Sequence, residues 1–209
     1  MCRWVELVSG SLKFLLLLAV LQLLAACASG PPTRTENVCS IFSQKSGWHR
    51  AALKAEKKWG VPKHVSLAIM AQESSFRSEA RPPRKYYLGV VPGPRPSTAY
   101  GYAQALNGTW KEYIEETGDY WRRRDDFVDA LDFINWYVTT ASDTNKLRVT
   151  DTYNIYLNYH EGLAGFRRGS YQKKPWLKDV AKKVDKRAQQ YAVQYESCKN
   201  NFGKRWLFF

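Results

Sequence analysis

Apolar residues recur along this chain at the three- and four-residue spacing that places them on one face of a helix. Six segments follow this spacing or open on a residue typical of a helix start. We therefore predict helices over residues 47–59, 62–73, 108–117, 126–141, 151–159 and 175–195, with glycines breaking the chain between the last two. No segment competes with them as a strand, so the pattern indicates an all-α fold.

Residues 77–98 interrupt the helical pattern. They are basic and contain Pro82, Pro83, Pro92, Pro94 and Pro96. Long loops in compact domains are usually functional or disordered. Because this loop lies between two segments that carry candidate site residues, we predict that it forms a lip over a cleft.

One predicted helix carries a carboxyl group to its end. Val65, Ala68 and Ile69 share a face, and Glu73 lies one turn beyond Ile69. Burial of this face places Glu73 in apolar surroundings at the negative end of the helix dipole, and both effects raise a carboxyl pKa. A glycosidase uses a carboxylic acid that stays protonated near neutral pH to protonate its leaving oxygen. The alternative is that Glu73 is simply a polar residue at a helix end.

Three short motifs follow one another along the chain. They are Ala71-Gln72-Glu73-Ser74-Ser75-Phe76, Ala99-Tyr100-Gly101-Tyr102-Ala103-Gln104 and Leu157-Asn158-Tyr159-His160-Glu161-Gly162. In these motifs and their order, the chain resembles the SLT-type lytic transglycosylases, relatives of goose-type lysozyme that cleave peptidoglycan. The resemblance extends over roughly residues 46–195 and implies a lysozyme-like, all-α domain with a catalytic cleft.

The resemblance implies a role for each matched residue. Glu73 matches the catalytic acid, and Tyr159 matches a tyrosine whose hydroxyl lies beside that acid in the cleft. Substrate contacts are implied for Ser74, Ser75, Gly101, Tyr102, Gln104, Tyr159 and His160. The chain departs from the family pattern where Tyr102-Ala103 replace Leu-Met and where His160 replaces Asn. The structural alternatives are helix capping for the serines, packing for the tyrosines and a plain turn for Gln104.

No second carboxylate lies in a recognisable motif. Glu79 follows Glu73 closely, and Asp126, Asp129 and Glu161 stay open as partners. A single acid suits a reaction assisted by the substrate's own N-acetyl group. The resemblance implies cleavage of the β-1,4 bond between N-acetylmuramic acid and N-acetylglucosamine with a 1,6-anhydro product. A hydrolytic, lysozyme-like muramidase and a non-catalytic peptidoglycan-binding lipoprotein are the alternatives.

The N-terminal residues are typical of an export signal. Arg3 and Lys13 accompany an almost wholly apolar run over residues 14–24, which is short for a membrane span. The run ends at Leu24-Ala25-Ala26-Cys27, which resembles the lipobox of bacterial lipoproteins and implies cleavage before Cys27 and acylation of that residue. Because Ala28 is not the Asp of an inner-membrane retention signal, we predict an outer-membrane lipoprotein that faces the periplasm. The alternative is an ordinary signal peptide followed by a chance cysteine.

This assignment divides the chain and its cysteines. We expect a signal peptide over residues 1–26, a lipidated tether over 27–45, the transglycosylase domain over 46–198 and a tail over 199–209. Cys2 leaves with the signal peptide and Cys27 is acylated, so Cys39 and Cys198 are left to form a disulfide in an oxidising periplasm. Two free thiols are the alternative. The histidines do not fall at ligand spacings, so we expect no metal site and no cofactor.

The net charge of +13 would suit a nucleic-acid partner, but export argues against one. The charge also suits the acidic stem peptides of the cell wall. We therefore expect two partners, the glycan strands of peptidoglycan and the outer-membrane lipid through acylated Cys27; the sequence identifies no protein partner. The run Arg122-Arg123-Arg124 is more typical of a solvated corner than of a binding site.

Overall fold

The computed structural model describes residues 30–202, which are largely helical. The only strands in this range, β1 (Tyr86–Tyr87) and β2 (Val91–Pro92), pair antiparallel. The predicted all-α fold is confirmed. The helices are α2 (Val38–Gln44), α3 (Ser46–Trp59), α4 (Lys63–Ser74), α5 (Asn107–Thr117), α6 (Phe127–Asn145), α7 (Thr152–Arg167) and α8 (Pro175–Cys198), with short 3₁₀ turns η1 (Ser170–Lys173) and η2 (Lys199–Asn201).

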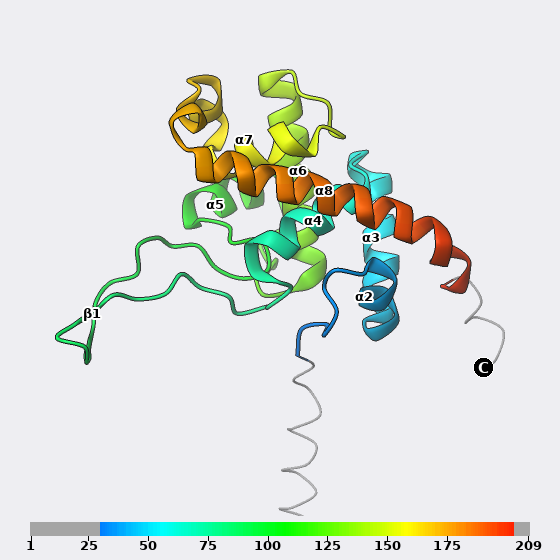
Figure 1. Cartoon of the computed structure of the whole chain (residues 1–209), viewed down its shortest axis with the longest axis horizontal. Helices are drawn as coiled ribbons and strands as arrows, with labels where there is room; N and C mark the ends of the chain where they lie inside the picture. The colour runs from blue at the N-terminus through cyan, green and yellow to red at the C-terminus, as the bar shows by residue number, and fades with distance from the viewer. Residues whose placement is uncertain (1–29, 203–209) are drawn as a thin grey trace, which may run out of the picture. The chain divides into compact units, whose positions relative to one another are not determined.

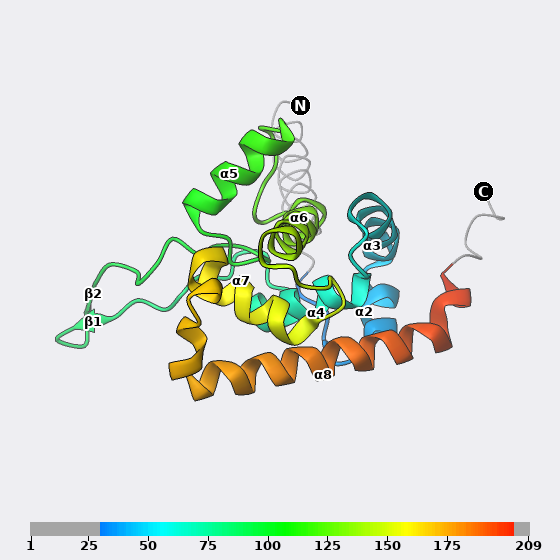
Figure 2. The ribbon, with the colours of Figure 1, turned by 90° about the horizontal axis from the view of Figure 1, so that it is seen from above.

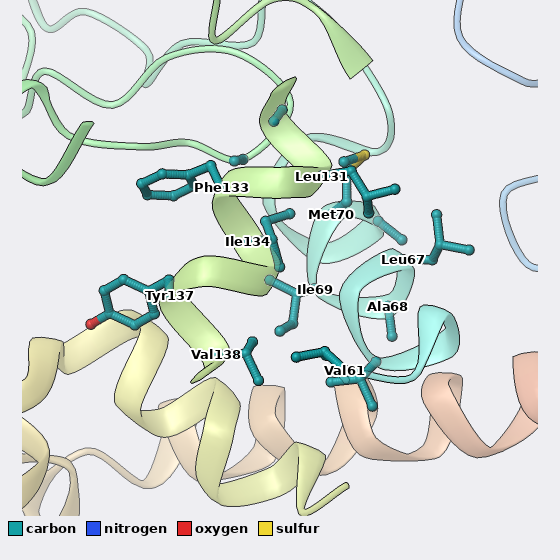
Figure 3. Close-up of a cluster of buried hydrophobic side chains, with 14 of the residues drawn as sticks. Val61, Leu67, Ala68, Ile69, Met70, Leu131, Phe133, Ile134, Tyr137 and Val138 are labelled. Carbon is teal, nitrogen blue, oxygen red and sulfur yellow. The ribbon is translucent and has the colours of Figure 1, made fainter. Parts of the chain in front are cut away.

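Helix α4 lies in the middle of the molecule, where it contacts α3, α6 and α8 (Figures 1 and 2). The sequence indicated one buried face, but every residue from Val65 to Ala71 is buried. Apolar side chains of α4 and α6 point toward one another, as Ile69, Ile134 and Val138 do in Figure 3. The core therefore surrounds α4, and the helix delivers its last residues from inside the protein.

Several helix ends follow signals that are local in the sequence. Gly60 ends α3 in the left-handed conformation, with φ 70°. Asp126 caps α6 through its side chain, and Pro175 is the first residue of α8. α7 differs from the prediction, because it continues to Arg167 through a kink at Gly162, whose φ is 74° and ψ 163°. The expected glycine break is thus a kink inside one element.

The expected domain boundaries need correction at both ends. Val38, Ile41 and Phe42 of α2 are buried, and α2 packs on α3 and α8. Residues 38–44 are therefore part of the folded core and not of a tether, because these three side chains are covered by helices distant in sequence. Beyond Cys198, Phe202 stacks edge-on against Phe42 with ring centroids 5.7 Å apart, so the fold extends past residue 198.

A disulfide joins Cys39 of α2 to Cys198 at the end of α8, with Cα atoms 6.0 Å apart. This is the pair that the cysteine inventory predicted. The predicted signal peptide, Cys27 and residues 203–209 lie outside the described residues. Within residues 30–202, no helix combines the length and the apolar character needed to cross a membrane.

We predict that Cys39 and Cys198 resist alkylation in the unfolded, unreduced protein and that both react after reduction. Peptide mapping by mass spectrometry checks each position separately. Cys39→Ser should lower the free energy of unfolding by roughly 4–5 kcal/mol, because the bridge restricts a long loop in the unfolded chain. The double variant with Cys198→Ser is the control for the new free thiol. Alkylation of both cysteines without reductant would exclude the bridge.

Candidate active site

Glu73 is the residue before the last of α4, and the chain turns sharply behind it. Ser75 and Phe76 both have left-handed backbones, with φ 51° and 58°. Such residues cost of order 1–3 kcal/mol each and persist where surrounding structure holds them. Here the buried Phe76 ring packs near Trp48, with centroids 5.7 Å apart. This packing ends α4 directly after Glu73 and fixes its carboxyl at the helix terminus.

The surroundings of Glu73 hold its carboxyl close to half-protonated at neutral pH. Burial raises the Glu73 pKa from 4.5 to about 7. The Tyr156 hydroxyl, which is placed to hydrogen-bond the carboxyl, lowers the pKa and offsets part of that effect. A group with a pKa near the working pH can donate a proton and then accept one, which is the requirement for general acid–base catalysis.

Two tyrosines of α7 share the space beside Glu73. Burial raises the Tyr159 pKa well above 10, and the charge of Glu73 raises it further, so Tyr159 lies near the carboxyl. Its hydroxyl, however, donates to the Ala103 carbonyl at 2.7 Å. Tyr156, one turn earlier on the same helix face, is the tyrosine placed to contact Glu73. The sequence reasoning missed Tyr156, although its three-residue spacing from Tyr159 could have identified it.

The loop over residues 99–105 is built around Gly101. With φ 80°, Gly101 lies so close to Arg124 that a Cβ atom would lie 2.0 Å from the Arg124 carbonyl oxygen. The same carbonyl accepts from the Tyr102 N–H at 3.1 Å. The Arg124 guanidinium donates to the Ala105 carbonyl at 2.9 Å. Arg124 therefore anchors the loop, which corrects the interpretation of the arginine run as a solvated corner.

The side chains of Tyr102 and Gln104 both make contacts with other residues of the protein. The Gln104 amide nitrogen donates to the carbonyls of Ala80 and Gly101, each at 2.8 Å. The Tyr102 ring packs edge-on against Trp48 at 5.8 Å between centroids. These contacts shape the loop over residues 99–105. A substrate contact by either residue would therefore use the polar atoms that are not engaged in them.

A pocket of about 180 Å³ brings several predicted site residues together. Gln104, Tyr159 and His160 line it, along with Thr109 and Tyr137. Tyr159 belongs both to this pocket and to the group beside Glu73, so it connects the two. Two of the predicted site residues, Ser74 and Ser75, do not line this pocket. Ser74 is buried and its hydroxyl donates to the Met70 carbonyl at 3.2 Å, whereas Ser75 is exposed.

A carboxylate fixes the orientation of His160. His160 Nδ1 lies 3.0 Å from the Glu161 carboxylate, and the His160 ring meets Trp176 edge-on at 5.2 Å between centroids. Lys174 donates to the same carboxylate at 2.7 Å, and Ser170 also donates to it. Burial would raise the Glu161 pKa, but the bonds from Lys174, Ser170 and His160 prevail and lower it to about 2. Glu161 is therefore ionised and cannot be a proton donor near neutral pH.

The other candidate carboxylates are engaged in the fold. Asp126 accepts from the first N–H groups of α6. Asp129 accepts from the Arg123 N–H at 2.9 Å. Glu79 is exposed. In the described part of the chain, no group of three or more His, Cys, Asp or Glu residues could hold a metal ion. Burial raises the pKa of Asp129 as well, but Glu73 is the member of this set whose pKa is raised to about 7.

The comparison with protein families agrees with this geometry. A family model described as the transglycosylase SLT domain matches residues 15–198, which is most of the chain. The chain belongs to this family. No curated protein matches it. The resemblance inferred from the three motifs is confirmed, and membership of the SLT family implies lytic transglycosylase activity on peptidoglycan.

We predict that Glu73→Gln stabilises the protein above pH 7. The wild-type carboxyl ionises near pH 4.5 when unfolded but near 7 when folded, so the stability of the wild type falls between these values, by up to about 3 kcal/mol. The variant does not lose stability in this way. The free energies of unfolding of the two proteins should therefore converge below pH 4.5. Urea unfolding across the pH range provides the measurement.

Glu161→Gln is the matched control, and its effect on the free energy of unfolding should have the opposite sign. The wild-type Glu161 carboxyl has a pKa of about 2 in the folded protein, so its ionised form stabilises the protein above pH 4.5. This contribution to stability disappears as the pH falls toward 2. The variant should therefore be less stable than the wild type at neutral pH. Parallel pH dependences for the two variants would contradict the assigned environments.

We predict that Gly101→Ala destabilises the protein more than Gly118→Ala. Both glycines are left-handed, with φ 80° and 70°, so each substitution carries a backbone cost of roughly 1–2 kcal/mol. Only at Gly101 does the new methyl group also overlap a backbone oxygen; at Gly118 it meets open space. Urea unfolding compares the two losses, and equal losses would show that Arg124 does not confine the loop.

Proposed function

We propose that this protein cleaves the β-1,4 bond between N-acetylmuramic acid and N-acetylglucosamine in peptidoglycan and leaves a 1,6-anhydro end. The observation that carries the proposal is the raised pKa of Glu73 at the end of buried α4, in a chain of the SLT family. In a two-carboxylate glycosidase, a second carboxyl group lies about 5–10 Å from the acid. Here the candidate partners Asp126, Asp129 and Glu161 are engaged elsewhere, which favours a single-acid route.

The reaction uses Glu73 twice. Its protonated carboxyl donates to the oxygen that leaves C1 of N-acetylmuramic acid, while the N-acetyl group of the substrate stabilises C1. The resulting carboxylate then takes the proton of the C6 hydroxyl, and O6 bonds to C1 to close the anhydro ring. Glu73 ends the cycle protonated, so no water is consumed.

Tyr156 and burial act on opposite halves of this cycle. A hydroxyl that donates to the carboxylate favours the ionised form, which is the form left after the first proton transfer. Burial favours the neutral form, which is needed at the start. The opposition of these two effects keeps the Glu73 pKa near 7 instead of higher. Tyr159 has a different part, because its bond to Ala103 holds the loop over residues 99–105 against α7.

We predict that Glu73→Gln lowers muropeptide release by at least about 100-fold, the lower end of the loss typical of a removed general acid. Gln keeps the size of the side chain but has no proton to donate. Mass spectrometry of digested peptidoglycan should show anhydro ends with the wild type. Reducing ends, heavier by one water, would instead identify a hydrolytic muramidase.

The control is Tyr159→Phe, which removes one hydroxyl and should cause a smaller loss. A Glu73→Gln variant that keeps more than about a tenth of wild-type release would fall outside the usual range for general acids and contradict the assignment. If the wild type binds peptidoglycan and releases nothing, the protein is a non-catalytic binding lipoprotein.

We further propose that the mature protein is an outer-membrane lipoprotein held by acylated Cys27. The support is the sequence Leu24-Ala25-Ala26-Cys27 after an apolar run. Cys27→Ser should leave an unacylated precursor, which metabolic labelling with a fatty-acid analogue and membrane fractionation would reveal. A variant that is still processed and found in the outer membrane at wild-type levels would exclude this anchor.

A further inference from the structure

Residues 84–95 form a hairpin, called the ribbon here, that projects from the helical body; its arms pair as strands at residues 86–87 and 91–92. Figures 1 and 2, at right angles to each other, both show it extending beyond the helices. At its end Tyr86 pairs with Pro92 and Tyr87 with Val91. Residues 86–91, which include both strands and the turn between them, are called the ribbon tip here.

Hydrogen bonds hold the ribbon in this shape. The Gly93 N–H donates to the Lys85 carbonyl at 2.7 Å, and the Arg84 guanidinium donates to the Gly93 carbonyl at 3.4 Å. Nearer the helical body, Arg95 donates to the Pro82 carbonyl at 2.5 Å. These bonds link the two arms at successive levels. They therefore fix the conformation of the ribbon behind its tip.

The ribbon tip exposes a group of apolar and aromatic side chains. Leu88 is 95 % exposed, and Val90 is 76 % exposed. The neighbouring Tyr86, Tyr87 and Val91 are also more than half exposed, and none of these side chains packs against the core. Single exposed apolar residues are normal, but a contiguous group marks an interaction site. The tip does not line the pocket beside Tyr159.

Positive charge lies directly behind the tip. Arg84 and Lys85 are exposed, and Arg95 is partly exposed on the opposite arm. None of the three forms an ion pair with a carboxylate within residues 30–202. Residues 77–98 hold five Arg or Lys and a single acidic residue, Glu79, so the base of the ribbon is strongly cationic.

We propose that the ribbon tip inserts into the surface of a lipid bilayer with anionic headgroups. Leu88 and Val90 would enter the acyl boundary, and the two tyrosines, with Val91 paired to Tyr87, would lie at the headgroup level that amphipathic rings favour. Arg84, Lys85 and Arg95 would contact the headgroups, each cation contributing attraction to an anionic surface. This order of apolar tip, tyrosines and cations matches the order of layers in the bilayer.

A glycan strand fits the tip less well. Sugars can stack on tyrosine rings, but the aliphatic side chains offer no hydrogen bonds to a hydroxyl-rich chain. Moving aliphatic surface from water into an apolar medium is favourable in proportion to the area moved. A bilayer supplies such a medium. The proposal does not depend on the role of Glu73, so it stands or falls separately from the proposed function.

The test places an environment-sensitive fluorescent amino acid at position 88 of the full chain, reconstituted with vesicles. A second protein carries the same amino acid at position 121, because Trp121 is 92 % exposed and also stands next to arginines. Any N-terminal anchor is then equal in both proteins. The vesicles contain phosphatidylcholine alone or with phosphatidylglycerol, and matched samples carry nitroxide-labelled acyl chains.

With phosphatidylglycerol, emission from position 88 should shift to shorter wavelength and be quenched by the nitroxides, while position 121 should do neither. Arg84→Gln with Lys85→Gln should weaken insertion roughly fivefold for each removed charge. The proposal is overturned if position 88 is not quenched in anionic vesicles or if position 121 is quenched equally. A shift at position 88 that occurs with isolated peptidoglycan and not with vesicles would instead assign the tip to the wall.

Discussion

Desolvation of the Glu73 carboxyl at the end of α4 is the constraint on which the proposed chemistry depends. The helix is surrounded by α3, α6 and α8, and every residue from Val65 to Ala71 is buried. Its last residues therefore emerge from an apolar interior, where an ionised carboxylate is costly. The Tyr156 hydroxyl offsets part of that cost, and the balance leaves a pKa of about 7. The helix packing that stabilises the fold thus also raises the pKa of Glu73, the proposed acid.

The same site holds a second carboxylate in the opposite state. The Glu161 side chain is only 4 % exposed, yet Lys174, Ser170 and His160 keep it ionised. Divergent surroundings of this kind separate the roles of two acidic groups. Glu73 can exchange a proton near neutral pH, whereas Glu161 holds the His160 ring at the pocket wall. The role of each glutamate thus follows from the groups around it and not from its residue type.

Much of the fold could be predicted from the sequence, because apolar spacing and caps such as Asp126 act within a few residues of where they lie. The family could be predicted from short motifs in order, and the raised pKa of Glu73 from its place at the end of an apolar helix. The rest depends on contacts between distant segments. The α2 residues appear unremarkable until α8 covers them, and Arg124 resembles a surface charge until its loop folds back onto it. Tyr156 carries no motif, and its contact with Glu73 arises only when α7 packs beside the end of α4.

The protonation state of Glu73 is the most direct test of this account. The carboxyl carbon of Glu73 can be followed by ¹³C NMR across the pH range, with the resonance assigned by its loss in Glu73→Gln. The account predicts a midpoint near pH 7, with the neutral acid still well populated at physiological pH. A midpoint near 4.5, the ordinary value for a glutamate, would show that the carboxyl is not desolvated and would contradict its role as the acid.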